Sequence, residues 1–222
     1  MIRKTLTVSF VAAAMVAIGV VKEAKADVIS WTDWTSLGSG ILSQNGATIG
    51  VGYSGASGTG ISSDARRWRE SSTPGAYTGS TVIDNAPVDS ITQIYAGSNT
   101  VTFAQAVIDP VMTFFSIGNG GTGLYLTFDQ DFEFLSTGGG NWGNGPLIQT
   151  ASNVLYGREG NGAIQFLGAV TSISWSANRY ESYYGFNVGA AATVVPEPAS
   201  LALLGVGLAG LGIARRRSRK AA

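Results

Sequence analysis

Short alternations of polar and apolar residues dominate this chain between residues 27 and 192. Residues 124–128 read Leu-Tyr-Leu-Thr-Phe, and residues 171–176 read Thr-Ser-Ile-Ser-Trp-Ser. A period of two places successive side chains on opposite faces of a β-strand, whereas an amphipathic helix needs apolar residues three or four positions apart. No stretch of this region shows a convincing helical period. The sequence therefore predicts an all-β domain of half-buried strands.

Further predicted strands are bounded by clusters of Gly, Asn, Ser or Pro, which form turns. They cover residues 28–33, 47–53, 91–95, 100–105, 111–117, 132–134, 154–156, 164–166 and 183–188. About ten short strands, separated by such turn residues, are typical of an antiparallel β-sandwich, and we expect one of jelly-roll type. Residues 52–60, which are rich in Gly and Ser, are predicted to form a long loop within the sandwich.

The first 26 residues have the organisation of a secretory signal peptide. Arg3 and Lys4 precede a largely apolar stretch, and Ala24 and Ala26 give a small-x-small pattern before Asp27. Signal peptidase recognises such a pattern, so we predict export through the Sec translocon and cleavage after Ala26. A permanent N-terminal anchor is the alternative, but the apolar stretch is short and rich in alanine.

Three features follow one another near the C-terminal end of the sequence. The first is Pro196-Glu197-Pro198, whose prolines hold the preceding residues extended and remove two backbone N–H donors. The second is the uncharged stretch 199–214, which as a helix would span about 24 Å, slightly less than a ~30 Å hydrocarbon core. The third is a basic cluster that we interpret as a cytoplasmic stop-transfer signal. It consists of Arg215, Arg216, Arg217, Arg219 and Lys220.

This order of a Val-Pro-Glu-Pro-Ala segment, a Leu/Gly/Ala-rich helix and an arginine cluster resembles the PEP-CTERM sorting signal of Gram-negative bacteria. The resemblance implies transient anchoring in the inner membrane, processing by an exosortase-like enzyme, and delivery to the cell surface or the exopolysaccharide matrix. A plain tail anchor that is never processed is the alternative. The predicted organisation is a signal peptide at 1–26, a sandwich at 27–188, a linker at 189–195 and a sorting signal at 196–220 with its transmembrane helix at 199–214.

The domain between the two ends is acidic and lacks several catalytic side chains. Residues 27–192 hold 12 Asp and Glu against five Arg, a net charge of −7, so nucleic acid is not an expected partner. The chain contains no His or Cys, and this domain contains no Lys. Imidazole and thiol nucleophiles, Schiff bases and ordinary zinc, haem or iron–sulfur sites are therefore excluded. We predict a non-catalytic protein without a cofactor; the alternative is a glycosidase-like enzyme with paired carboxylates.

Three carboxylates alternate along one predicted strand: Asp129, Asp131 and Glu133. If the strand is straight, they share one face and repel one another unless something compensates their charge. A calcium ion would do so, because it binds several oxygen ligands. The favoured interpretation is a turn at Asp129 and Gln130 with solvated carboxylates.

Trp142 lies in a Gly-Gly-Gly-Asn-Trp-Gly-Asn-Gly stretch without apolar neighbours. An indole there would stack on a sugar ring while Asn141 and Asn144 hydrogen-bond to its hydroxyl groups, which makes extracellular polysaccharide a candidate partner. The alternative is a tryptophan that folds back to cap one end of the sandwich. Trp175, which alternates with serines, is expected in the core.

The segment Asp64–Glu70 places three arginines around Trp68. Planar guanidinium groups bind phosphates and acidic sugars. The acidic residues at the two ends of the segment favour local salt pairing instead. If this segment does bind a ligand, an acidic exopolysaccharide fits an exported protein better than nucleic acid.

Overall fold

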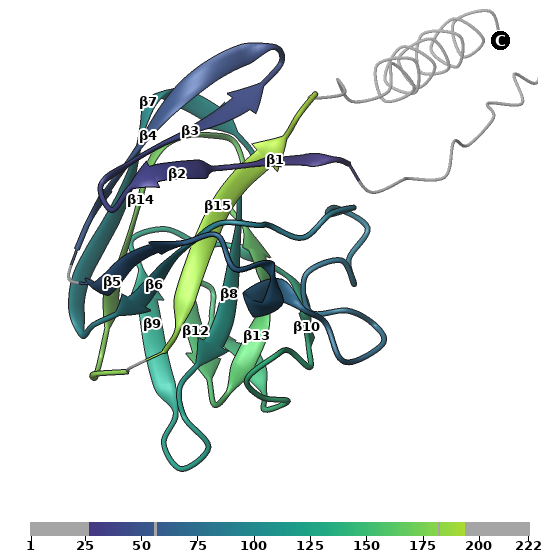
Figure 1. The fold of residues 1–222 in the computed structure, drawn as a ribbon, viewed down its shortest axis with the longest axis vertical. Helices are drawn as coiled ribbons and strands as arrows, with labels where there is room; N and C mark the ends of the chain where they lie inside the picture. Colours follow the sequence, from purple (N-terminus) through teal and green to yellow (C-terminus); the bar gives the residue numbers. More distant parts are fainter. Residues whose placement is uncertain (1–26, 56, 182, 194–222) are drawn as a thin grey trace, which may run out of the picture. The chain divides into compact units, whose positions relative to one another are not determined.

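Fifteen β-strands and one short 3₁₀ helix make up the regular structure of the described residues in a computed structural model (Figure 1). The structure describes residues 27–55, 57–181 and 183–193. The predicted signal peptide and sorting signal lie outside these residues. Within them, no helix is long and apolar enough to cross a membrane.

The strands form two antiparallel sheets, which confirms the predicted β-sandwich. The first sheet has the order β11 (Leu147–Ala151), β12 (Val154–Gly157), β9 (Leu124–Phe128), β14 (Ala169–Ala177), β7 (Gly97–Ile108), β4 (Ala47–Ser54), β3 (Ser39–Gln44) and β2 (Asp33–Ser36). The second sheet has the order β10 (Glu133–Gly138), β13 (Gly160–Gln165), β8 (Val111–Ile117), β15 (Gly185–Ala191), β6 (Ser90–Ile94) and β5 (Ser57–Ser62). In the second sheet, β1 (Ile29–Trp31) also pairs with β15.

In the C-terminal two thirds of the domain, the strands pair in a nested order. β7 pairs with β14, β8 with β13, and β9 with β12. From β7 to β10, and again from β12 to β15, successive strands alternate between the two sheets. The two arms of a long nested hairpin thus cross together from one sheet to the other.

Aromatic side chains from both sheets meet in the core. The ring of Phe186 on β15 lies 6.0 Å from that of Trp34, 5.4 Å from that of Tyr53 and 5.1 Å from that of Trp175. Edge-to-face and tilted contacts at these distances stabilise the core beyond simple burial of area. Trp175 is buried, as predicted.

Asn187, the residue after Phe186, uses all the hydrogen-bonding positions of its side chain. Its Oδ1 accepts from Trp34 Nε1 at 3.1 Å and from the N–H of Val188 at 2.7 Å. Its Nδ2 donates to the carbonyl oxygens of Thr32 at 3.1 Å and Asp89 at 2.8 Å. This one buried amide therefore joins β15 to the crossing from β1 to β2 and to the start of β6.

Two predictions about connecting segments are wrong. Residues 52–60 are not a long loop, because β4 continues to Ser54 and β5 begins at Ser57. Residues 189–191 are not linker, because they complete β15 and pair with β1. Their small side chains suit close packing rather than flexibility: a Cβ atom on Gly189 would lie 2.7 Å from side-chain atoms of Ile29 and Trp31.

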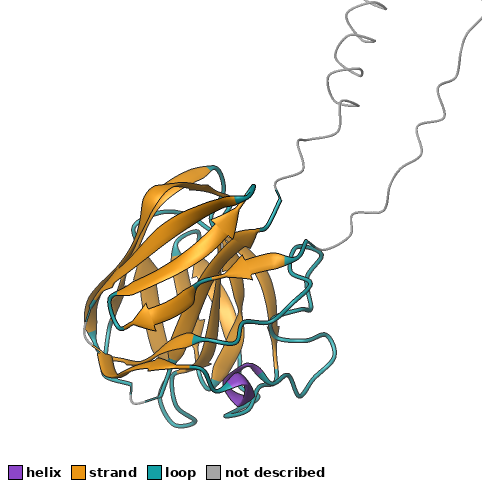
Figure 2. Cartoon of the chain, turned by 45° about the horizontal axis from the view of Figure 1, so that its top comes forward, coloured by secondary structure: helices purple, strands orange, loops and turns teal. Residues whose placement is uncertain are grey.

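A layer of loops covers the outer face of the second sheet. It contains the only helix of the described residues, η1 (Ala65–Trp68), coloured purple in Figure 2. Trp68, Ala76 and Tyr77 from this layer form a small buried cluster with Phe115 of β8. We name these four residues the outer cluster; the residues of the candidate site pack against it.

Candidate functional site

Phe115 anchors both segments in which the sequence analysis found candidate ligand-binding residues. Trp68 packs edge-on against Phe115 with ring centroids 5.1 Å apart, and its Nε1 donates to the carbonyl oxygen of Asp89 at 3.2 Å. Trp142 packs against the same Phe115 ring at 5.5 Å. The structure therefore joins two segments that lie far apart in the sequence.

The guanidinium group of Arg67 lies over the rings of Trp142 and Phe115. It is 5.0 Å from the ring centre of Trp142 and 5.7 Å from that of Phe115. Its Nε donates to Ser62 Oγ at 2.8 Å. Burial lowers the pKa of Arg67, but an arginine side chain stays charged in a protein. Trp142 thus contacts the sheet as a cap does, yet 38% of it remains exposed.

A tight turn presents Asn141 and Trp142. The N–H of Gly140 donates to the carbonyl oxygen of Gly143 at 2.9 Å, and the buried Asn161 of β13 donates to the same oxygen from Nδ2, also at 2.9 Å. A Cβ atom on Gly140 would lie 2.6 Å from Asn161 Cγ, so only glycine permits this approach. The glycine residues of this segment therefore allow a tightly packed turn.

Residues 69–74 and 138–146 are hydrogen-bonded together beside this turn. The N–H of Ser71 donates to the carbonyl oxygen of Gly139 at 2.9 Å, and the N–H of Gly139 donates to Ser72 Oγ at 2.7 Å. Ser71 Oγ donates to Asn144 Oδ1 at 3.0 Å. These bonds make the segment a preformed surface rather than a pair of independent loops.

Two hollows lie on this surface and share Ser71; together we name them the polar groove. The larger, of about 590 Å³, is lined by Asn144 and by Ser, Gly and Pro residues of the two segments, together with Thr137 of β10. The smaller, of about 450 Å³, is lined by Arg69, Glu70, Ser71, Gly140 and Asn141. Both volumes fall within the range of roughly 300–1,000 Å³ typical of ligand sites. Asn141 and Asn144 therefore line the polar groove, while Trp142 stands beside it.

The prediction of local salt pairing in the arginine segment is confirmed at Asp64 and wrong at Glu70. Arg66 Nε lies 2.9 Å from Asp64 Oδ1, and hydrogen bonds from Arg66 lower the pKa of Asp64. Glu70 pairs with no arginine in the described part of the chain. Its carboxylate instead accepts hydrogen bonds from the N–H groups of Tyr77 and Thr78 and from Thr78 Oγ1.

The three alternating carboxylates do not form a metal-binding cluster. Asp129 lies in a bend after β9, where its Oδ1 accepts from the N–H of Ser174 at 3.0 Å. Asp131 and Glu133 are exposed. No three acidic side chains of the described residues are gathered closely enough to hold a metal ion.

Sequence reasoning missed a pair of carboxylates, Asp33 and Asp89, close to Asn187, whose Nδ2 donates to the carbonyl oxygen of Asp89. Asp33 and Asp89 line the same shallow hollow, close enough for the charge of Asp33 to act on Asp89. Burial and the charge of Asp33 raise the pKa of Asp89.

This pair predicts a pH dependence of stability. Because the pKa of Asp89 is raised on folding, the folded protein binds more protons than the unfolded chain between the unfolded and the folded pKa of Asp89. Its free energy of unfolding therefore falls as the pH rises through the folded pKa. We expect Asp33→Asn to lessen this fall and to raise stability at pH 7, on the order of 0.5 kcal/mol after solvent screening.

Urea unfolding between pH 4 and pH 8 measures this effect. Asp131→Asn, which neutralises an exposed carboxylate, is the matched control and should leave the shape of the pH profile unchanged. Identical profiles for the parent protein and Asp33→Asn would show that the pair does not couple protonation to folding.

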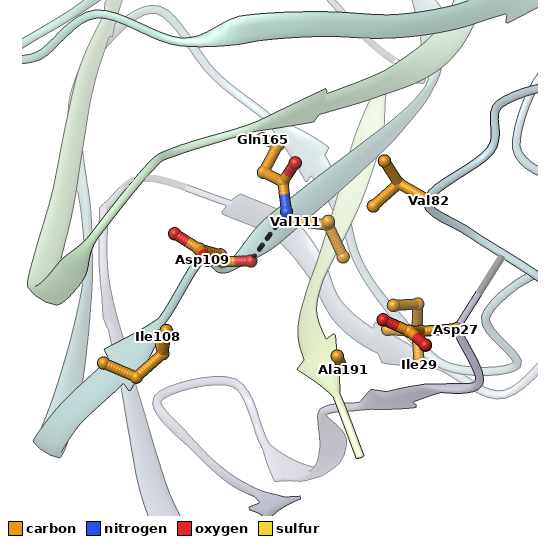
Figure 3. A pocket seen from close by; sticks show the side chains of 8 residues that line it. All are labelled: Asp27, Ile29, Val82, Ile108, Asp109, Val111, Gln165 and Ala191. Atoms are coloured by element: carbon orange, nitrogen blue, oxygen red, sulfur yellow. Dashed lines mark hydrogen bonds between the residues drawn. The ribbon is translucent and has the colours of Figure 1, made fainter. Parts of the chain in front are cut away.

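A third hollow lies where the two ends of the domain meet and is smaller. Figure 3 shows Asp109 and Gln165 on one side of it and Asp27 and Ile29 on the other; Gln165 Nε2 donates to the carbonyl oxygen of Asp109 at 3.1 Å. Its volume of about 120 Å³ lies below the roughly 300–1,000 Å³ of ligand sites. We therefore interpret it as a packing gap.

The family model described as the PEP-CTERM protein-sorting motif matches residues 194–219. This confirms the resemblance on which the sorting signal was predicted, with a start at residue 194 instead of 196. No curated protein and no solved structure matches the chain. Pro196, Glu197, Pro198, the apolar stretch, the basic cluster, Ala24 and Ala26 lie outside the residues that the structure describes.

Proposed function

We propose that this chain, which carries a PEP-CTERM protein-sorting motif at residues 194–219, is a non-catalytic protein of the cell surface or exopolysaccharide matrix of a Gram-negative bacterium. The match to the sorting motif carries this proposal. Export through the Sec translocon and cleavage after Ala26 precede sorting. The apolar stretch 199–214 then holds the protein in the inner membrane until an exosortase-like enzyme processes the tail.

Intact-mass analysis of the protein recovered from envelope and culture supernatant tests this proposal. We expect a mature N-terminus at Asp27 and, in the supernatant fraction, loss of the basic cluster. Recovery of only the full-length chain with its carboxyl terminus intact would contradict processing and would leave a plain tail anchor.

We assign carbohydrate binding to the polar groove. Apart from Arg69 and Glu70 in the smaller hollow, its walls are neutral hydroxyl, amide and backbone groups, which match the hydroxyl groups of a sugar. The two neighbouring hollows offer room for more than one ring. An exposed part of Trp142 stands beside them as an apolar surface. A carbohydrate-active enzyme on the same sorting tail is the competing function, and release of reducing ends from matrix polysaccharide would favour it.

Asn144→Ala tests the polar groove better than removal of Trp142. Trp142→Ala also uncovers Phe115 and Arg67, so it would lower stability and binding together. Asn144 is exposed, and the only hydrogen bond of its side chain to a described residue is that with Ser71 Oγ, so its loss should leave stability nearly unchanged. We expect about fivefold weaker retention on purified matrix polysaccharide, the effect of one neutral hydrogen bond.

Gln105→Ala on β7 of the opposite sheet is the control, because it removes an exposed amide of the same kind. Affinity electrophoresis measures retention, and thermal unfolding verifies that the variants are folded. Equal retention of Asn144→Ala and Gln105→Ala would remove the polar groove as the binding site.

A further inference from the structure

The charge beside the polar groove is opposite to that of the domain as a whole. Residues 27–192 carry a net charge of −7. Near the polar groove, however, Arg67 and Arg69 form no ion pair with any described residue, and the only salt bridge of the described residues is that of Arg66 with Asp64. Arg67 and Arg69 are thus two cationic side chains without a salt bridge on an anionic protein.

The carboxylates of this region interact with other groups. Asp64, whose charge also acts on Arg67, is paired with Arg66. Glu70 accepts three hydrogen bonds from Tyr77 and Thr78. Glu159, which packs beneath the turn at Gly143, accepts from the N–H of Gly120 at 3.0 Å. Neither Glu70 nor Glu159 forms a salt bridge that would neutralise the guanidinium groups.

Arg67 is also held in place before any ligand binds. It lies over the rings of Trp142 and Phe115, and its Nε donates a hydrogen bond to Ser62 Oγ. Its two Nη groups have no acceptor among the described residues. Arg69 lines the smaller hollow of the polar groove itself. A guanidinium group presents a planar set of donors that matches both oxygens of a carboxylate, and a stacked one loses little freedom on binding.

We propose that the polar groove selects acidic polysaccharides, with Arg69 and Arg67 binding the carboxylate groups of uronate residues and the neutral walls binding their hydroxyl groups. This inference rests on the proposed carbohydrate-binding function of the groove and adds the class of sugar. The negative charge of the rest of the domain repels acidic chains elsewhere on its surface, which restricts them to this site.

The test uses a matched pair of probes: polygalacturonate, and the same polymer with its carboxylates methyl-esterified. We expect the exported protein to bind the acidic polymer more tightly, with an affinity that falls as sodium chloride is raised. Arg69→Gln should weaken binding of polygalacturonate about tenfold, the effect of one charge-assisted hydrogen bond. Arg66→Gln is the control in the same segment, because Arg66 is already paired with Asp64.

Each outcome separates this inference from the proposed function. Equal binding of both polymers, or equal effects of Arg69→Gln and Arg66→Gln, would overturn acidic selection while the polar groove remained a carbohydrate site. Binding of neither polymer, together with retention on matrix polysaccharide that is unchanged in Asn144→Ala, would overturn the carbohydrate site itself. A lower affinity of Arg69→Lys than of the parent protein would support recognition by the planar fork, since lysine keeps the charge alone.

Discussion

Replacement of Pro196, Glu197 and Pro198 by alanine is expected to abolish release of the protein from the inner membrane. Alanine restores two backbone N–H donors and favours helix, so the apolar helix predicted at 199–214 would extend through the segment that a processing enzyme must bind in extended form. The full-length tail should then persist. Nearly all of the protein should fractionate with the inner membrane, and its intact mass should include the basic cluster.

Alanine substitution of Val194 and Val195 provides the control for this experiment. It changes two residues that the sorting motif also covers but keeps the Pro-Glu-Pro step. This variant should be trimmed and released like the parent protein. Normal trimming of the triple-alanine variant would show that the extended step is not what the processing enzyme recognises.

Asn187→Leu is expected to have the largest effect on stability. Leucine has nearly the same size, but it leaves the indole N–H of Trp34 and the carbonyl oxygens of Thr32 and Asp89 without their buried partner. An unsatisfied buried polar group costs about 1–3 kcal/mol, so the free energy of unfolding should fall by about 3–5 kcal/mol. For a domain of this size, the melting temperature would fall by roughly 10 °C.

Thermal and urea unfolding measure this loss, and Asn141→Leu is its matched control. Asn141 is exposed at the tip of its turn, and its side chain forms no hydrogen bond with the described residues, so the same substitution there should change stability little. Similar losses for the two variants would mean that leucine itself, rather than the broken network, is responsible.

Two strands were predicted from sequence to the residue, whereas β14 extends beyond the predicted alternation at residues 171–176. β8 and β9 have their predicted bounds, because apolar residues mark both strands and turn residues follow them. β5, by contrast, reads Ser-Gly-Thr-Gly-Ile-Ser and has no alternation; its extended form depends on pairing with β6. The strand β3 was also missed, although the Asn45-Gly46 pair that follows it is a typical sequence for a two-residue hairpin turn. In the structure these residues have the positive φ angles of 53° and 76° that such a turn requires.

The candidate site was predictable in its residues but not in its assembly. The exposed asparagines and the tryptophan of residues 141–144 were identified from their polar, glycine-rich surroundings. The stacking of Arg67 on Trp142 was not, because a contact between residues so distant in sequence leaves no local pattern. The same holds for Asp33 and Asp89, which meet only after β2 and β6 are positioned by β15 and its buried amide.

The position of β15 bears on the order of events during secretion. This strand lies between β8 and β6 in the interior of its sheet, yet it is the last described strand to be synthesised. Until residues 185–191 emerge from the ribosome, the nascent polypeptide lacks its innermost strand and cannot close its core. The topology therefore delays folding until nearly the whole domain has been made. This delay suits the proposed export route, in which an unfolded chain passes through the Sec translocon.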